Sequence, residues 1–151
     1  MMLETVHNNV DTGNWSFLES RLNATTNWSI NQVREAIAQY KNFLFLKKKY
    51  GGNYILPPSS DIDKVWHEHI LCTQHYSEFC DKFFGFYLHH TPESISKNNV
   101  CIETEFAKTR SLYFTEFNEH LYAIERSFLN LKFGRLISFW QKCTFNNTII
   151  E

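Results

Sequence analysis

The feature that most constrains this fold is the stretch 60–84, which contains no glycine or proline. Apolar and aromatic side chains recur along it at spacings of three and four residues, which is the period of an α-helix that buries one face. Ser60 and Asp63 have the spacing of a capping box, and Gly85 follows the last periodic residue. The pattern predicts one helix from Ser60 to Phe84, the longest well-defined helix of the fold.

The direction of each side chain around this predicted helix indicates which residues are buried. Trp66 and His69 lie on the apolar stripe and His75 lies off it, so we expect the first two to be buried and His75 to be exposed. Cys72 and Cys80 are eight residues apart, which is about 12 Å along a helix and too far for a disulfide. We therefore expect reduced thiols, as in cytosolic proteins.

Helical signals occur on both sides of this stretch. Ser29 and Gln32 form a capping-box pattern before an apolar stripe, and a shorter helix is expected to begin at Ser16. Apolar residues from 106 to 131 keep helical spacing, as one helix or as two with a break near Asn118. No alternating strand pattern occurs, so the sequence predicts an all-α, single-domain irregular bundle of four to six helices.

Charge and targeting signals exclude several classes of protein. The net charge is −1, and the basic run Lys47–Lys49 is explained by a helix C-terminus, so nucleic-acid binding is not expected. The N-terminus has neither a basic region followed by an apolar region nor any other signal-peptide feature. No apolar window of about 18 residues occurs. These features predict a cytoplasmic protein without a transmembrane segment.

One window of the sequence is rich in metal-ligand residue types. Five of the seven histidines lie between residues 67 and 90, together with aspartates and cysteines. Imidazole, carboxylate and thiolate groups are ligands for divalent transition metals such as zinc, iron or copper. The candidate metal ligands are Asp63, His67, His69, Cys72, His89 and His90.

Helix geometry divides these candidates into two sets. His67 and His69 are two residues apart and point about 200° away from each other, so they cannot share one ion. One set joins His69 and Cys72 with the turn 89–90. The other joins Asp63 and His67, which are one turn apart, with a partner from another helix. We favour the second set, because a metal on the buried stripe would need an access path.

Structural interpretations of the same residues compete with a metal site. His69 can be a core histidine bonded to a backbone carbonyl, Asp63 and His67 can brace the start of a helix, and the cysteines can act as small buried hydrophobes. No standard spacing such as H-E-x-x-H is present. A metal-free catalytic pair of histidine and cysteine is a third possibility. The sequence therefore leaves open whether the protein is an enzyme.

Two motifs within this window resemble a known family. W-H-E-H-I-L at 66–71 and G-F-Y-L-H-H-T-P at 85–92 resemble the glycine-rich domain-containing protein-like family, whose short bacterial members lack the glycine-rich part. The resemblance covers about residues 25–118 and implies a helical domain without an established reaction. An acidic residue commonly follows H-I-L in that pattern, whereas this chain has Cys72. If that position binds metal, the ligand changes from hard oxygen to soft sulfur.

The resemblance divides the chain into three parts. Residues 1–24 form an N-terminal segment with a short helix, 25–118 form the family-like helical core, and 119–151 form a C-terminal helical extension that packs on the core. Apolar residues are dense within 126–145, and basic residues are interspersed among them. This segment is expected to close the core, or to contact a protein partner, a second copy of the chain or a membrane surface. A non-catalytic interaction module is therefore the alternative to a metal-binding protein.

Overall fold

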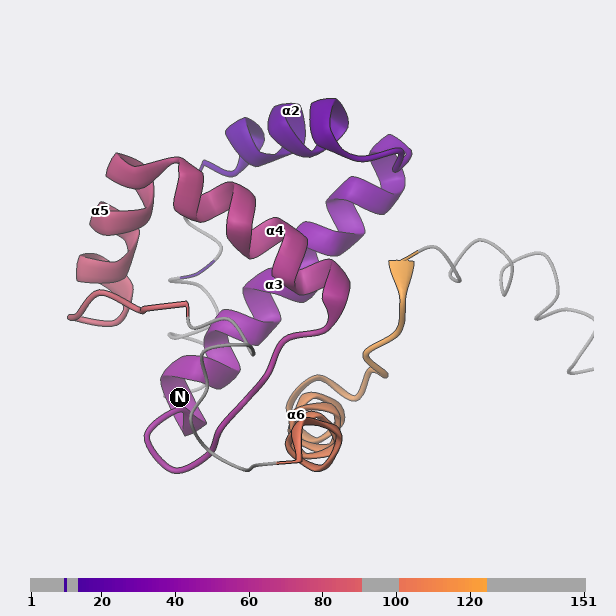
Figure 1. Ribbon diagram of the computed structural model, residues 1–151, viewed down its shortest axis with the longest axis vertical. Helices are drawn as coiled ribbons and strands as arrows, with labels where there is room; N and C mark the ends of the chain where they lie inside the picture. Colours follow the sequence, from indigo (N-terminus) through magenta and orange to yellow (C-terminus); the bar gives the residue numbers. More distant parts are fainter. Residues whose placement is uncertain (1–9, 11–13, 91–100, 125–151) are drawn as a thin grey trace, which may run out of the picture. The chain divides into compact units, whose positions relative to one another are not determined.

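The computed structural model describes residue 10 and the ranges 14–90 and 101–124. The chain divides into two compact units, 1–121 and 122–151, and the helices described below belong to the first. They are α2 (Ser16–Thr25), α3 (Ile30–Tyr50), α4 (Ser60–Leu71), α5 (Thr73–Phe83) and α6 (Ile102–Phe117) (Figure 1). These five helices, with no strand among the described residues, confirm the predicted all-α irregular bundle of four to six helices.

Several predictions for the C-terminal region lie outside the described residues. They include the partner-binding segment 126–145 and most of the extension 119–151. Across the described ranges, every helix is too short or too polar to cross a lipid bilayer. The cytoplasmic location stays a prediction.

Helix α3 is the longest described helix, with 21 residues, and it lies at the centre of the helix packing. It begins with the predicted capping box, in which the Ser29 hydroxyl accepts from Gln32 N–H and the Gln32 amide oxygen accepts from Ser29 N–H. Its buried face includes Tyr40, Phe43 and Leu44. This helix contacts α2 and α6 near its two ends and α4 along its length (Figure 1).

The prediction of one helix from residue 60 to residue 84 is wrong, because the helix is interrupted at Cys72, between α4 and α5. That residue has φ −85° and ψ 63°, which is the geometry of an inverse γ-turn and not of an α-helix. Cys72 N–H donates to the carbonyl of His69 at 3.0 Å, three residues back instead of four. Helix α5 therefore leaves at an angle to α4 (Figure 1). Both helices bury apolar faces, so the periodicity continued across the break and concealed it.

The start of α4 is also displaced by one residue from the prediction. Ser59 and not Ser60 is the N-cap, and its hydroxyl accepts from Ile62 N–H at 3.2 Å. Asp63 is therefore not the partner of a capping box. Its carboxylate remains available for other contacts at the surface of α4.

Side-chain hydrogen bonds hold helix α6 to the rest of its unit, including those from Lys49 and Tyr50 to Glu116. The Thr109 hydroxyl donates to the carbonyl of Pro57 at 3.1 Å, and the Asn42 amide donates to the Tyr113 hydroxyl at 2.9 Å. The helix is followed by Asn118 in the left-handed conformation, with φ 54° and ψ 30°. Of the two alternatives that the sequence left open, the structure therefore has the break near Asn118. The contacts place α6 beside the connector between α3 and α4.

Candidate metal centre

The first part of the candidate site is one face of α4. Asp63 and His67 lie one helical turn apart, and His67 Nδ1 is 2.8 Å from the Asp63 carbonyl oxygen and 3.3 Å from its carboxylate Oδ2. A carbonyl oxygen only accepts, so Nδ1 carries the proton in this hydrogen bond. In the neutral ring the lone pair is then at Nε2, which is the form that a metal requires.

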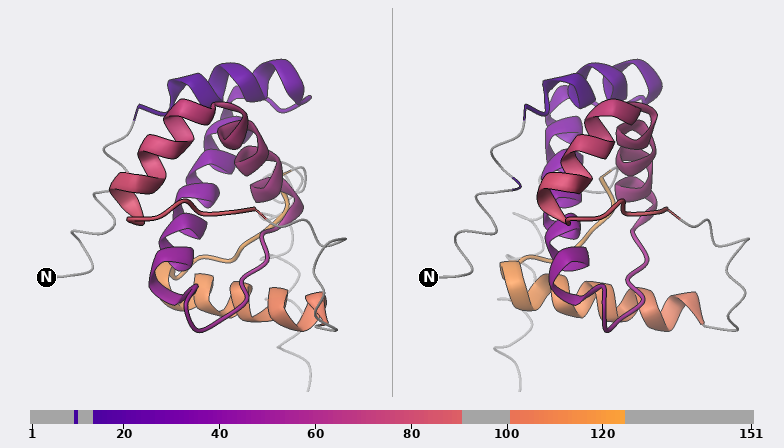
Figure 2. Two further views of the ribbon diagram at one scale, coloured as in Figure 1. Left: turned by 60° about the vertical axis from the view of Figure 1, so that its left-hand side comes forward. Right: turned by 90° about the vertical axis from the view of Figure 1, so that its left-hand side faces the viewer.

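The second part is the segment 84–90, which returns toward α4 after α5 ends (Figure 2). Gly85 permits the reversal with φ +78°, a conformation that favours glycine. The Tyr76 hydroxyl then ties the segment down, because it accepts from Trp66 Nε1 at 2.9 Å and donates to the Leu88 carbonyl at 2.6 Å. Trp66 is buried, as predicted. These three groups fix the backbone two residues before His90.

His90 completes a group of three ligand side chains. Its Nε2 lies 2.6 Å from Asp63 Oδ1, and its ring packs edge-on against Trp66 with 4.6 Å between ring centroids. One ligand atom from each of Asp63, His67 and His90 lies within 4.8 Å of the others. Among the described residues, this is the one group of three or more such side chains that could hold a metal ion.

The group borders a cavity of about 680 Å³. The cavity lies between the end of α3, the connector before α4, the exposed face of α4 and the first residue of α6. The side chains of His67, Asp63 and His90 are 53%, 35% and 12% exposed. The site is therefore open to water and small molecules, while His90 is held firmly at its inner edge.

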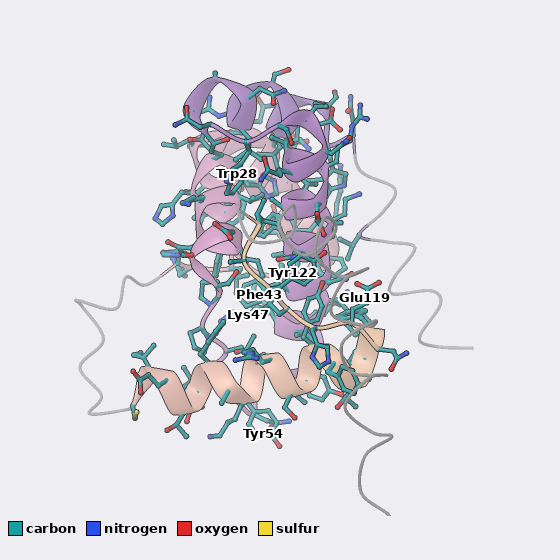
Figure 3. The ribbon with its side chains drawn as sticks, turned by 90° about the vertical axis from the view of Figure 1, so that its right-hand side faces the viewer. Trp28, Phe43, Lys47, Tyr54, Glu119 and Tyr122 are labelled. Carbon is teal, nitrogen blue, oxygen red and sulfur yellow. The ribbon has the colours of Figure 1, made fainter. Side chains whose placement is uncertain are left out.

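Lys47 lines the same cavity, although its sequence context did not mark it as a site residue. Its Nζ lies 5.6 Å from the Phe43 ring centroid and 5.8 Å from that of Trp66. Phe43 and Lys47 lie next to each other near the end of α3 that contacts α6 (Figure 3). Burial lowers the pKa of Lys47 to about 8, so the amine remains mostly charged at pH 7. The sequence feature that could have indicated a partly buried Lys47 is its position three residues after Leu44, which continues the buried stripe of α3.

A second histidine cluster lies on the opposite side of α4 and is buried. His69 is fully buried, as predicted, with Nδ1 2.9 Å from the Tyr40 hydroxyl and Nε2 2.9 Å from His75 Nδ1. Burial, and secondarily the charge of His75, lowers the pKa of His69 to about 3. Both nitrogens of a neutral ring are thus engaged in a chain of hydrogen bonds from Tyr40 to His75.

The prediction that His75 is exposed is wrong. His75 is partly buried, its ring centroid lies 4.2 Å from that of Phe17, and burial is the main cause that lowers its pKa. The break at Cys72 explains the difference, because the turn changes the direction in which α5 projects its side chains. On one continuous helix His75 would point outward, whereas with the helix interrupted at Cys72 it points toward His69.

The remaining candidate ligands lie apart from the group of three. Cys72 forms the joint between α4 and α5 and lines a different cavity together with His75. His89 borders the metal-group cavity but is not one of the three clustered ligands. The group of three therefore combines Asp63 and His67 from one predicted set with His90 from the other. The sequence predicted a third candidate ligand on another helix, whereas the third member of this group, His90, lies on the return segment.

The sequence matches a protein family described as UCP032817-like over residues 10–125, which is more than three quarters of the chain. The chain belongs to this family. The match covers the predicted core, but its description does not support the glycine-rich naming, which stays a prediction. No curated protein and no solved structure matched the chain.

Proposed function

We propose that this member of the UCP032817-like family binds one divalent transition metal ion, zinc or iron, through Asp63, His67 and His90. The observation that carries the proposal is the convergence of one ligand atom from each residue within 4.8 Å. Two imidazole nitrogens and one carboxylate oxygen are a ligand set of catalytic zinc and of non-haem iron. Three protein ligands leave at least one coordination position for water or another molecule. The lack of a cysteine in the set disfavours monovalent copper.

Asp63 and His90 would have to move slightly apart to accommodate the ion, and the proton shared between them would have to leave. Two ligand atoms at about 2.1 Å from a tetrahedral metal lie about 3.4 Å apart. His90 Nε2 and Asp63 Oδ1 are 2.6 Å apart, so rotation of these two side chains by less than about 1 Å is sufficient. The hydrogen bond from His67 to a backbone carbonyl is an outer-shell contact of the kind that orients metal-binding histidines.

A non-catalytic interaction module is the second candidate, and the return segment supplies its support. There the hydrogen bond between His90 and Asp63 would serve only to hold this segment on α4. Phe86 and Tyr87 on the same segment are 58% and 40% exposed, which suits contact with a partner protein. Such a protein would bind no stoichiometric metal.

Metal analysis of the protein without a histidine tag separates the two candidates. We expect close to one zinc or iron per chain after reconstitution and removal of free metal. His67→Gln and His90→Gln should each lose the metal, whereas the matched control His89→Gln should retain it. Metal-free wild-type protein after reconstitution would leave the interaction module as the better explanation. Retention by both ligand variants would exclude this site.

A further inference from the structure

We infer that the cavity beside the metal group binds a small organic carboxylate, whose carboxylate oxygens lie between the metal ion and the Lys47 ammonium. This inference rests on the proposed function, because the ion supplies one of the two contacts. The carboxylate would occupy the open coordination position of the ion.

The charges that line the cavity do not balance once a metal is bound. Among the described residues that border it, Asp63 is the one acidic side chain and Lys47 is the one lysine or arginine. A divalent ion and the ammonium together carry three positive charges, and the Asp63 carboxylate offsets one. Buried or half-buried positive charge is costly when it is unpaired, so an anion in the cavity would be favoured.

The Lys47 ammonium is available to such an anion. Its described contacts are the faces of Phe43 and Trp66, and among the described residues no carboxylate forms an ion pair with it. The two rings restrict the lysine side chain on one side of the cavity. Less side-chain freedom is therefore lost when the ammonium engages a ligand.

The walls of the cavity favour a carboxylate with an apolar body. Much of the lining is apolar, including Ile55, Leu56, Pro57 and Ile102, and the volume of about 680 Å³ is in the range of small-molecule sites. Phosphate sites usually combine arginine forks or free helix N-terminal N–H groups. Among the described residues, the lining of this cavity contains no arginine, and the start of α4 is capped by Ser59. The start of α6 at Ile102 has no side-chain cap, so the apolar walls and the lack of an arginine fork are what favour a carboxylate over a phosphate.

Calorimetric titration of the zinc-loaded protein with phenylacetate tests the inference. Zinc affinity is measured first for each protein. We expect Lys47→Met to bind zinc normally and phenylacetate about tenfold more weakly or worse, because a charge-assisted hydrogen bond is lost. Lys47→Arg should stay within a few fold of wild type. Lys82→Met is the matched control, since Lys82 is an exposed lysine of α5 outside the cavity, and its affinity should not change.

The outcomes distinguish this inference from the proposed function. If zinc binds but phenylacetate affinity is the same in wild type and Lys47→Met, the inference is wrong and the metal site stands. Equal binding of neutral phenylacetamide, or tighter binding of inorganic phosphate, also overturns the carboxylate assignment. If wild-type protein binds no zinc, both conclusions fail together. Circular dichroism of each variant verifies that it is folded, and the Lys47→Arg result supplies the test if Lys47→Met is not.

Discussion

Helix α4 carries two histidines that lie two residues apart and end in opposite surroundings. His69 is fully buried, and its two ring nitrogens contact Tyr40 and His75. His67 is 53% exposed, with one nitrogen bonded to a backbone carbonyl and the other available. The same residue type on the same helix therefore supports a core hydrogen-bond chain on one face and a candidate metal site on the other.

The difference shows that partners, and not residue type, decide what a histidine can do. Burial holds the pKa of His69 near 3, so the ring is neutral, but its hydrogen-bonding capacity is already used within the protein. The side chains of Asp63, His67 and His90 lie beside an open cavity, and one hydrogen bond, from His90 Nε2 to Asp63 Oδ1, joins their ligand atoms. A metal would displace one hydrogen bond at the exposed cluster, whereas at the buried cluster it would have to disrupt the core.

The largest expected effect is the contrast between truncations of the two histidines. His69→Ala should lower the free energy of unfolding by roughly 3–5 kcal/mol, because it leaves a cavity and an unpaired Tyr40 hydroxyl. His67→Ala in metal-free protein should change it by less than about 0.5 kcal/mol, as at other exposed positions. Urea denaturation with EDTA present measures both values. Equal losses would mean that the two faces of α4 are not different in the way described.

The pH dependence of stability should report on the buried cluster. Because the folded pKa of His69 is about 3 and the unfolded value is near 6.5, the unfolded chain binds more protons between these values. Stability should therefore fall as the pH drops below 6.5, by about 3 kcal/mol at pH 4 from this residue. Urea denaturation at several pH values measures it. A His69→Gln variant should lack this component, and an unchanged slope in the variant would assign it to other groups.

Metal binding should stabilise the protein through Asp63, His67 and His90 only, and not through the buried histidine cluster. Zinc at about a hundred times its dissociation constant should raise the free energy of unfolding by about 2.7 kcal/mol. EDTA should reverse the gain, and His67→Gln should abolish it. His75→Gln, a change at the buried cluster, should keep it. Thermal or urea denaturation with and without zinc measures the difference, and a gain that survives His67→Gln would contradict the assignment.

The smallest effect should come from the hydrogen bond that anchors the return segment. Trp66→Phe removes the donor to the Tyr76 hydroxyl and should cost about 1–2 kcal/mol of stability. Because Tyr76 also holds the Leu88 carbonyl, His90 should become less well positioned and zinc affinity should fall about tenfold. Denaturation and zinc titration measure the two effects. An unchanged zinc affinity would show that this anchor does not position His90.

Much of the fold followed from the sequence because its causes are local. The Ser29 capping box and the stripe of α3 depend on residues within a few positions of one another, and both were predicted. The break near Asn118 was one of two alternatives that the sequence left open. The burial of Trp66 and His69 also followed from helical period. The break at Cys72 did not, because no glycine or proline marks it and the apolar pattern continues on both sides.

The sequence by itself determined that the chain is helical and that Asp63 and His67 share one face of a helix. Only the tertiary structure decided that His90, and not a residue of another helix, lies beside them. That choice depends on the turn at Cys72, the reversal at Gly85 and the bond from Tyr76 to the Leu88 carbonyl. Helical periodicity describes contacts between residues three or four positions apart. The bond from Trp66 to Tyr76 and the bond from His90 to Asp63 join residues 10 and 27 positions apart, and they depend on how the helices pack.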